Sequence, residues 1–156
     1  MAGDDLHNLT GLFADIPVGV IAPGEIPAVP VNGIVSDSRA VVPGNLFVAL
    51  SGGSEDGHRY IPAAVKNGAA AVVGTQPLSG LSVPYIQVAE SREALAYLAA
   101  AFFGFPARHL TVIGVTGTDG KTTTSNLIYQ ILLAAGKAAG VISTVNAVIG
   151  DEVIDT

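Results

Sequence analysis

The residues best suited to chemistry in this 156-residue chain lie between positions 114 and 124, where glycines and threonines surround one lysine. In such a turn the glycine backbone wraps around phosphate oxygens, the lysine ammonium reaches the outer phosphates, and the next hydroxyl binds Mg²⁺. The strict consensus requires glycine at position 115, where valine stands, so the match is to the variant G-x-x-G-x-x-G-K-T. The pattern predicts a nucleotide phosphate site, rather than a turn with a solvated lysine, formed by Thr116, Gly117, Thr118, Asp119, Gly120, Lys121, Thr122 and Thr123.

The segments on either side would position this turn. Residues 110–115 form an apolar run that is typical of a buried parallel strand. After the turn, apolar side chains recur at helical spacing, and Gly136 offers a left-handed end to the helix. The strand would therefore deliver the turn to the start of a helix, where unpaired N–H groups and the helix dipole favour an anion.

Composition narrows the classes of function. The net charge of −6 argues against a general nucleic-acid or membrane-surface binder, and 49% hydrophobic residues are ample for a core. The absence of cysteine excludes disulfides, thiolate metal sites and cysteine nucleophiles. Four prolines interrupt the apolar segment 16–31, so neither a signal peptide nor a membrane span is expected there. We therefore expect a cytoplasmic protein.

The chain upstream of the loop is predicted to form a small α/β unit. Residues 1–30 read as an arm with one helical turn, and strands are predicted at 33–36, 46–50, 70–73 and 85–88. A helix is predicted near 59–67, with Pro62 in its first turn and Gly68 after its last. Ser91 is predicted to cap a second helix that ends at residues 104–106, which we take as the domain boundary.

Downstream of the boundary we expect the opening of a Rossmann-like, parallel-sheet ATPase domain. A second apolar run, 138–142, would lie parallel to the first through a right-handed crossover. Residues 145–149 and 152–154 would form a hairpin around Gly150. Only about 50 residues follow Pro106, fewer than a nucleotide-binding domain needs, so the sequence is expected to be truncated.

Two sets of motifs resemble one enzyme family, the Mur ligases, which add amino acids to the nucleotide-linked peptidoglycan precursor. The segment 113–124 is similar to their ATP loop. Several upstream segments are similar to their N-terminal UDP-sugar domain, namely Asp37-Ser38-Arg39, residues 42–50, Gly52, Asp56-Gly57-His58 and Gly68-Ala69. The form G-T-D-G-K-T-T-T and Ile142-Ser143-Thr144 look most like the MurE type, which adds the third stem-peptide residue to UDP-N-acetylmuramoyl-L-alanyl-D-glutamate.

The resemblance implies a UDP-binding domain at residues 31–106 and the beginning of an ATP-binding central domain at 107–156. It implies a ligase that uses ATP and Mg²⁺ to convert the precursor carboxylate into an acyl phosphate, which the incoming amino acid then attacks. Lys121 would be catalytic and Thr122 the metal ligand, while the precursor would be bound by Ser38, Gly53, Ser54 and Glu55. We expect a monomer at full length, no nucleic-acid or membrane partner, and no ligation by this fragment alone, because the amino-acid domain would lie beyond it.

Three alternatives stay open. A MurF-type ligase, which adds D-Ala-D-Ala, shares the N-terminal pattern, and a non-catalytic nucleotide-binding module would use the same residues without turnover. Another class of P-loop kinase would explain the loop but not the pattern at residues 37–58. Within that pattern, a single histidine at the start of a helix favours a structural role for His58 over a contact with the diphosphate. Asp56 is interpreted primarily as a turn residue.

Overall fold

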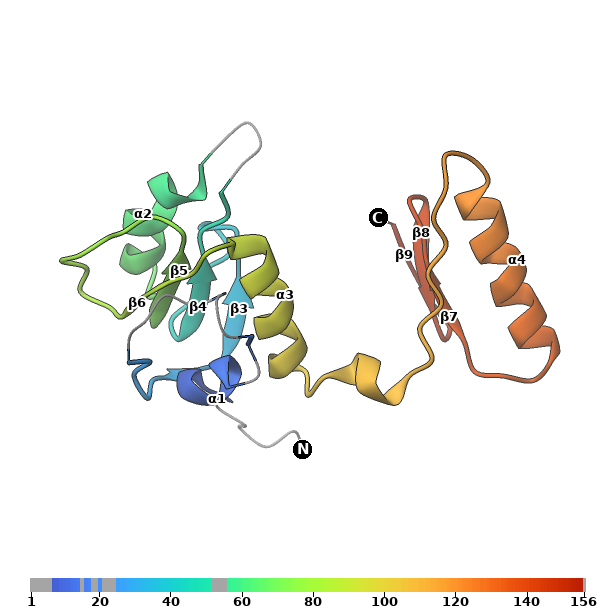
Figure 1. Ribbon diagram of the computed structural model, residues 1–156, viewed down its shortest axis with the longest axis horizontal. Coiled ribbons are helices and arrows are strands. Elements are labelled where there is room, and N and C mark those ends of the chain that lie inside the picture. The colour runs from blue at the N-terminus through green and yellow to red at the C-terminus, as the bar shows by residue number, and fades with distance from the viewer. Residues whose placement is uncertain (1–6, 15, 18–19, 21–24, 52–55, 156) are drawn as a thin grey trace. The chain divides into compact units, whose positions relative to one another are not determined.

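The computed structural model describes residues 7–14, 16–17, 20, 25–51 and 56–155, and they form two compact units, residues 1–110 and 111–156 (Figure 1). Unit 1 contains a parallel four-stranded sheet in the order β3 (Gly33–Val35), β4 (Asn45–Val48), β5 (Ala71–Gly74) and β6 (Tyr85–Gln87). Every residue of β4 and β5 is buried, as expected for central strands that are covered on both faces. The α/β class and all four predicted strands are confirmed, with ends that differ by one or two residues.

Helices cover this sheet. The predicted first helix is present as the 3₁₀ turn η1 (Gly57–Tyr60) followed by α2 (Ile61–Lys66), with proline in the first turn of α2. The second is α3 (Ser91–Phe102), but its N-cap is Glu90 and not Ser91 as predicted. The Glu90 carboxylate accepts a hydrogen bond from Arg92 N at 3.1 Å, whereas the Ser91 hydroxyl is fully buried and accepts one from Ser51 N. The hydroxyl is therefore used for a contact far along the chain.

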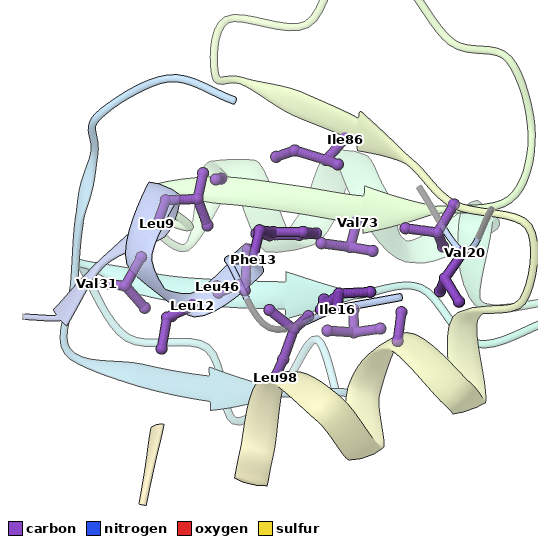
Figure 2. Close-up of a cluster of buried hydrophobic side chains, with 14 residues drawn as sticks. Leu9, Leu12, Phe13, Ile16, Val20, Val31, Leu46, Val73, Ile86 and Leu98 are labelled. Carbon is purple, nitrogen blue, oxygen red and sulfur yellow. The ribbon is translucent and has the colours of Figure 1, made fainter. Parts of the chain in front are cut away.

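The N-terminal segment contributes to the core rather than lying outside it. Its short helix α1 (Leu9–Phe13) places Leu9 and Phe13 among the side chains of β4, β5 and α3, including Leu98 (Figure 2). The strand β1 (His7–Asn8) pairs antiparallel with β2 (Pro30–Val31), which fixes the other end of the segment. The opposite face of the sheet packs against α2 through Val41, Phe47, Ala49, Ile61, Ala64, Ala69 and Val72. The period-2 alternation of β4 thus supplies both apolar clusters.

Unit 2 consists of one helix and a three-stranded antiparallel sheet. The helix α4 (Lys121–Ala134) confirms the predicted one, and β8 (Asn146–Ile149) and β9 (Glu152–Asp155) form the predicted hairpin around Gly150, whose φ is 59°. The 3₁₀ turn η2 (Pro106–His109) lies before this unit in the chain.

Two predictions for unit 2 are wrong. Residues 111–116 form no strand, and β7 (Gly140–Ile142) does not lie parallel to them but pairs antiparallel with β8. Pairing with a strand that follows after a three-residue turn costs less loop-closure entropy than pairing with a parallel partner that is reached through a helix. The local pairing therefore forms, and Val112 and Ile113 are left 72% and 54% exposed.

Candidate functional site: a phosphate loop and a sheet edge

The predicted phosphate loop lies between residues 114 and 120 and leads directly into α4. Gly120, at the N-cap position, has a φ of 74°, and Gly117 has a φ of 150°, so both have backbone angles that side chains other than glycine rarely adopt. No side chain caps this helix. The first amides of α4 are therefore not taken up by a capping oxygen, which is the arrangement in which a helix start can bind an anion.

Lys121 is folded over the loop that precedes it. Its Nζ donates to the carbonyl oxygens of Gly117 at 2.6 Å and Thr118 at 3.1 Å. Those two contacts hold the ammonium group against the loop that leads into α4. A positive charge at this end of a helix is disfavoured by the helix dipole unless an anion accompanies it. The arrangement is thus chemically suited to the outer phosphates of a nucleotide.

The other predicted loop residues surround this lysine in sequence. Thr116, Asp119 and Thr123 are exposed, and Thr122 is half-buried in the first turn of α4. One turn further on, the Asn126 amide donates to the carbonyl oxygen of Thr122 at 2.9 Å and braces that turn. A threonine hydroxyl together with phosphate oxygens is a donor set that Mg²⁺ accepts, so these residues fit the ion. Within the described part of the chain, no group of three His, Asp or Glu side chains forms a metal site of its own.

The predicted uridine residue Ser38 lies in the turn that leaves β3. Its side chain is buried, and its carbonyl oxygen accepts from the Asn67 amide at 2.9 Å. The preceding Asp37 accepts from Arg39 N at 2.9 Å and from the Arg39 guanidinium at 2.7 Å. These hydrogen bonds hold the pKa of Asp37 at about 2. The turn is therefore fixed on both sides of the serine.

A second turn, which enters β4, explains the spacing of the motif Val42-Pro43-Gly44-Asn45. The buried Asn45 side chain accepts from Val42 N at 3.0 Å and donates to Asn32 Oδ1 at 2.9 Å. Gly44 has a φ of 91°, and a Cβ there would lie 2.5 Å from the Asn32 amide nitrogen. The motif thus builds a tight entry into the central strand.

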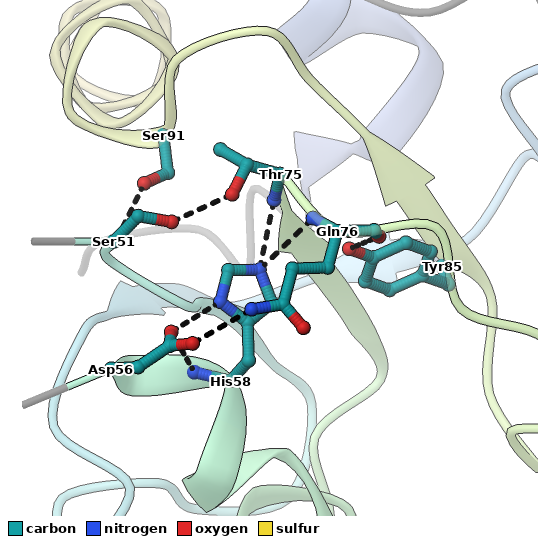
Figure 3. A network of polar contacts seen from close by, with 7 residues as sticks. All are labelled: Ser51, Asp56, His58, Thr75, Gln76, Tyr85 and Ser91. Atoms are coloured by element: carbon teal, nitrogen blue, oxygen red, sulfur yellow. Dashed lines mark hydrogen bonds and ion pairs between the residues drawn. The ribbon is translucent and has the colours of Figure 1, made fainter.

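The carboxyl ends of β4 and β5 carry a polar network centred on the buried His58 (Figure 3). The imidazole Nδ1 lies 2.6 Å from Asp56 Oδ1, and Nε2 accepts from Thr75 N at 2.9 Å and from Gln76 N at 3.3 Å. The hydrogen bond from His58 is the main reason that the pKa of Asp56 is lowered. In open parallel sheets, ligands bind at the carboxyl ends of the strands. The structural interpretation of His58 and Asp56 agrees with these contacts.

The remaining predicted substrate residues, Gly53, Ser54 and Glu55, lie outside the described residues. The structure therefore brings together the phosphate-loop residues in unit 2 and places Ser38 in the turn after β3 in unit 1. It also shows polar contacts of Ser51, Thr75 and Gln76 that the sequence did not predict, and a contact of Ser91, which was predicted only as a helix cap. The sequence did not indicate these contacts, because the partners are far apart along the chain.

Comparison with known families agrees with both motif sets. Residues 30–103 match the family described as "Mur ligase family, catalytic domain", and residues 115–156 match the "Mur ligase middle domain". The chain belongs to the Mur ligase family. The first match contains the Ser38 turn, and the second contains the Lys121 loop.

Curated Mur ligases are closely similar in sequence to this chain. The UDP-N-acetylmuramoyl-L-alanyl-D-glutamate--2,6-diaminopimelate ligase of Chlorobium phaeobacteroides is 47% identical over 150 residues, which are 94% of this chain and 29% of that protein. The UDP-N-acetylmuramyl-tripeptide synthetase of a Roseiflexus species is 50% identical over 135 residues, 83% of this chain and 26% of that protein. The chain therefore spans less than a third of the length of these relatives.

Solved Mur ligase structures have the same fold. MurF from Acinetobacter baumannii superposes with a TM-score of 0.61 at 31% identity, over 83% of this chain and 28% of that one. A UDP-N-acetylmuramoyl-L-alanyl-D-glutamate--2,6-diaminopimelate ligase superposes with a TM-score of 0.71 at 24% identity, over 96% of this chain and 30% of that one. At that identity the second likeness concerns the fold alone. In the part of this Mur ligase chain that the structure describes, no helix is long and apolar enough to cross a bilayer.

Proposed function

We propose that this chain belongs to a MurE-type ligase that joins an amino acid to UDP-N-acetylmuramoyl-L-alanyl-D-glutamate in peptidoglycan synthesis. The observation that carries the proposal is the pair of family matches in order, combined with 47% and 50% identity to relatives that are named for this reaction. The precursor carboxylate would attack the γ-phosphate of ATP to give an acyl phosphate and ADP. The incoming amine would then displace phosphate and form the amide.

Within this scheme we assign the nucleotide phosphates to unit 2. Gly117, Gly120 and the first amides of α4 would surround the phosphate oxygens, and Lys121 would turn from its two loop carbonyls toward the γ-phosphate. Thr122 would hold Mg²⁺, which neutralises phosphate charge when it is bound. Thr116, Thr118, Asp119 and Thr123 complete the proposed ATP site.

We assign the uridine nucleotide to unit 1. Ser38 is held in a rigid turn after β3, and we assign a uridine contact to its hydroxyl. We assign Gly53, Ser54 and Glu55 to the same site from their position in the sequence. The proposed domains accordingly remain 31–106 for the uridine nucleotide and 107–156 for the start of the ATP domain, in a cytoplasmic enzyme.

The amino acid we propose is 2,6-diaminopimelate. Relatives from Chlorobium phaeobacteroides, Geobacillus thermodenitrificans and Listeria innocua, at 47%, 50% and 43% identity, are named as ligases of that amino acid. A MurF-type ligase is the second candidate, because solved MurF structures match at 31% and 35% identity. The identity to the first group is higher, which favours the MurE type.

Isothermal titration with UDP, with the precursor UDP-N-acetylmuramoyl-L-alanyl-D-glutamate and with ATP·Mg²⁺ tests the two assigned sites. We expect Ser38→Ala to weaken binding of UDP and of the precursor by about tenfold, the loss of one well-placed hydrogen bond, and to leave ATP unaffected. Ser36→Ala, which alters an exposed hydroxyl two residues earlier, is the matched control.

Lys121→Ala should abolish measurable ATP binding and leave UDP binding unchanged. Lys137→Ala removes an exposed lysine beyond the end of α4 and should change neither. ATP binding without any uridine recognition would contradict the assignment of unit 1 and would favour another class of P-loop protein.

A further inference from the structure

The contacts of His58 define its protonation state. Nε2 receives two backbone hydrogen bonds, from Thr75 N at 2.9 Å and from Gln76 N at 3.3 Å, so it must offer a lone pair and carries no hydrogen. The proton of the neutral ring is therefore on Nδ1, which donates to Asp56 Oδ1 at 2.6 Å. A second proton on Nε2 would face two N–H donors. The geometry thus requires a neutral imidazole in the Nδ1–H tautomer.

The imidazole cannot turn away from these partners. Only 5% of the His58 side chain is exposed. A Cβ at Gly74 would lie 2.6 Å from His58 Nε2 and 2.6 Å from Tyr85 Oη, so only glycine leaves room for the ring beside β5. Tyr85 Oη in turn donates to the Gln76 carbonyl at 2.6 Å and fixes the backbone that the ring holds.

Through this network both ends of the connection that leaves β4 are tied to the end of β5. At the first end, Ser51 Oγ and Thr75 Oγ1 share a 2.6 Å hydrogen bond, and Ser51 N donates to Ser91 Oγ at 3.1 Å. At the other end, Asp56 receives the imidazole Nδ1–H and also the Gln76 side-chain amide at 2.7 Å. Figure 3 shows the imidazole between Asp56 and the Thr75–Gln76 backbone.

We propose that His58 is a positioning residue for the uridine nucleotide: its neutral Nδ1–H imidazole joins Asp56 to the end of β5 and so orders the carboxyl ends of β4 and β5 before the ligand arrives. The inference rests on the proposed uridine function of unit 1. β4 lies between β3, which carries the Ser38 turn, and β5, so the tie acts one strand away from that turn. Ordering a binding edge in advance removes an entropy cost from association and increases affinity without any contact to the ligand.

Two variants separate positioning from folding in the 156-residue chain. His58→Gln can place an amide oxygen near the Thr75 and Gln76 amides but loses the Nδ1–H bond to Asp56. Asp56→Ala removes the other partner from a half-exposed position. Asp56 also caps η1 by accepting from His58 N at 3.0 Å, so Asn8→Ala, which removes the similar 3.1 Å cap bond from Thr10 N in α1, is the matched control.

Each protein is titrated with UDP by calorimetry and heated to measure its unfolding midpoint, and the wild-type imidazole is observed by ¹H–¹⁵N NMR. We expect the Nδ1–H tautomer in the wild type, UDP binding about tenfold weaker in His58→Gln and Asp56→Ala, and unchanged UDP binding in Asn8→Ala despite a lowered midpoint. The weaker binding should appear while both variants still unfold cooperatively.

The outcomes distinguish this inference from the function on which it rests. Wild-type UDP binding that both variants retain would overturn the positioning role and leave the uridine site intact. Failure of the wild type to bind UDP would refute the uridine site, and this inference with it. A proton on Nε2 in the wild type would contradict the proposal whatever the variants do, and if His58→Gln does not fold, Asp56→Ala decides the binding result.

Discussion

Replacing Asn45 by alanine should destabilise unit 1 far more than the same replacement of an exposed polar residue would. The amide makes two hydrogen bonds, one from Val42 N and one to Asn32 Oδ1, and the residue is only 5% exposed. Two lost hydrogen bonds cost about 2 kcal/mol, and leaving the Val42 N–H without its partner adds roughly 1 kcal/mol. We therefore expect the free energy of unfolding to fall by about 3 kcal/mol.

Urea unfolding followed by circular dichroism measures this change, and thermal unfolding should show a midpoint lower by roughly 12 °C, at about 4 °C per kcal/mol for a unit of this size. Asn32→Ala is the matched control, because the residue is exposed and water can replace its bonds to Asn45 and to the Pro43 carbonyl; we expect a cost of about 1 kcal/mol.

The double variant Asn32→Ala/Asn45→Ala tests whether the two amides act as a pair. Because both single variants remove the same Asn45–Asn32 bond, the double variant should cost about 1 kcal/mol less than the sum of the two. A cost for Asn45→Ala no greater than that for Asn32→Ala would refute the argument that burial of this amide stabilises the entry into β4.

Three further predictions concern the core, a turn and an ion pair. Phe13→Ala should lower the free energy of unfolding of unit 1 by about 3–5 kcal/mol, because the residue is only 3% exposed and lies in the main apolar cluster; a loss below about 1 kcal/mol in urea unfolding would contradict the packing of α1. Gly68→Ala should destabilise by at least about 1 kcal/mol, since its φ is 97° and a Cβ would lie 3.0 Å from Pro43 Cα; an unchanged unfolding midpoint would argue against that backbone. The lowered pKa of Asp37 means that its ion pair with Arg39 stabilises the fold fully above pH 3.8, and that this contribution is lost as the pH falls through about 2. In an NMR titration the Asp37 midpoint should be near 2 and should rise toward 3.8 in Arg39→Ala, whereas a value near 3.8 in the wild type would contradict the pairing.

The sequence predicted best those elements whose cause is local. β4 and β5 are short runs in which every residue is buried, and α4 has apolar side chains at helical spacing, so pattern alone located them. The hairpin was found because Gly150-Asp151 between two apolar runs is a turn signal, and the φ of 59° at Gly150 agrees with that turn. The phosphate-loop residues lie in a single glycine-rich turn between two apolar runs, so the same kind of signal located that turn.

Features that depend on distant partners were not predicted. The N-cap of α3 is Glu90 and not Ser91, because the Ser91 hydroxyl accepts a hydrogen bond from the backbone N–H of Ser51, forty positions earlier. The polar partners of His58 follow a different strand, and no local pattern marks Thr75 or Gln76 as the residues that its ring would meet. The 110–115 run was read as a strand from hydrophobicity, but a strand also needs a neighbour, and β7 pairs with β8 instead.

The packing of α1 against α3 has a consequence for how the protein is made. Leu9 and Leu98 meet in one cluster, yet a ribosome that adds about 5–20 residues per second releases them several seconds apart. During that interval each new strand of the parallel sheet can join the strand that was made before it, since the order in the sheet is the order of synthesis. The apolar side chains of α1 can contact β4 and β5 as soon as those strands are made, but their packing against α3 forms only when synthesis of unit 1 is nearly complete.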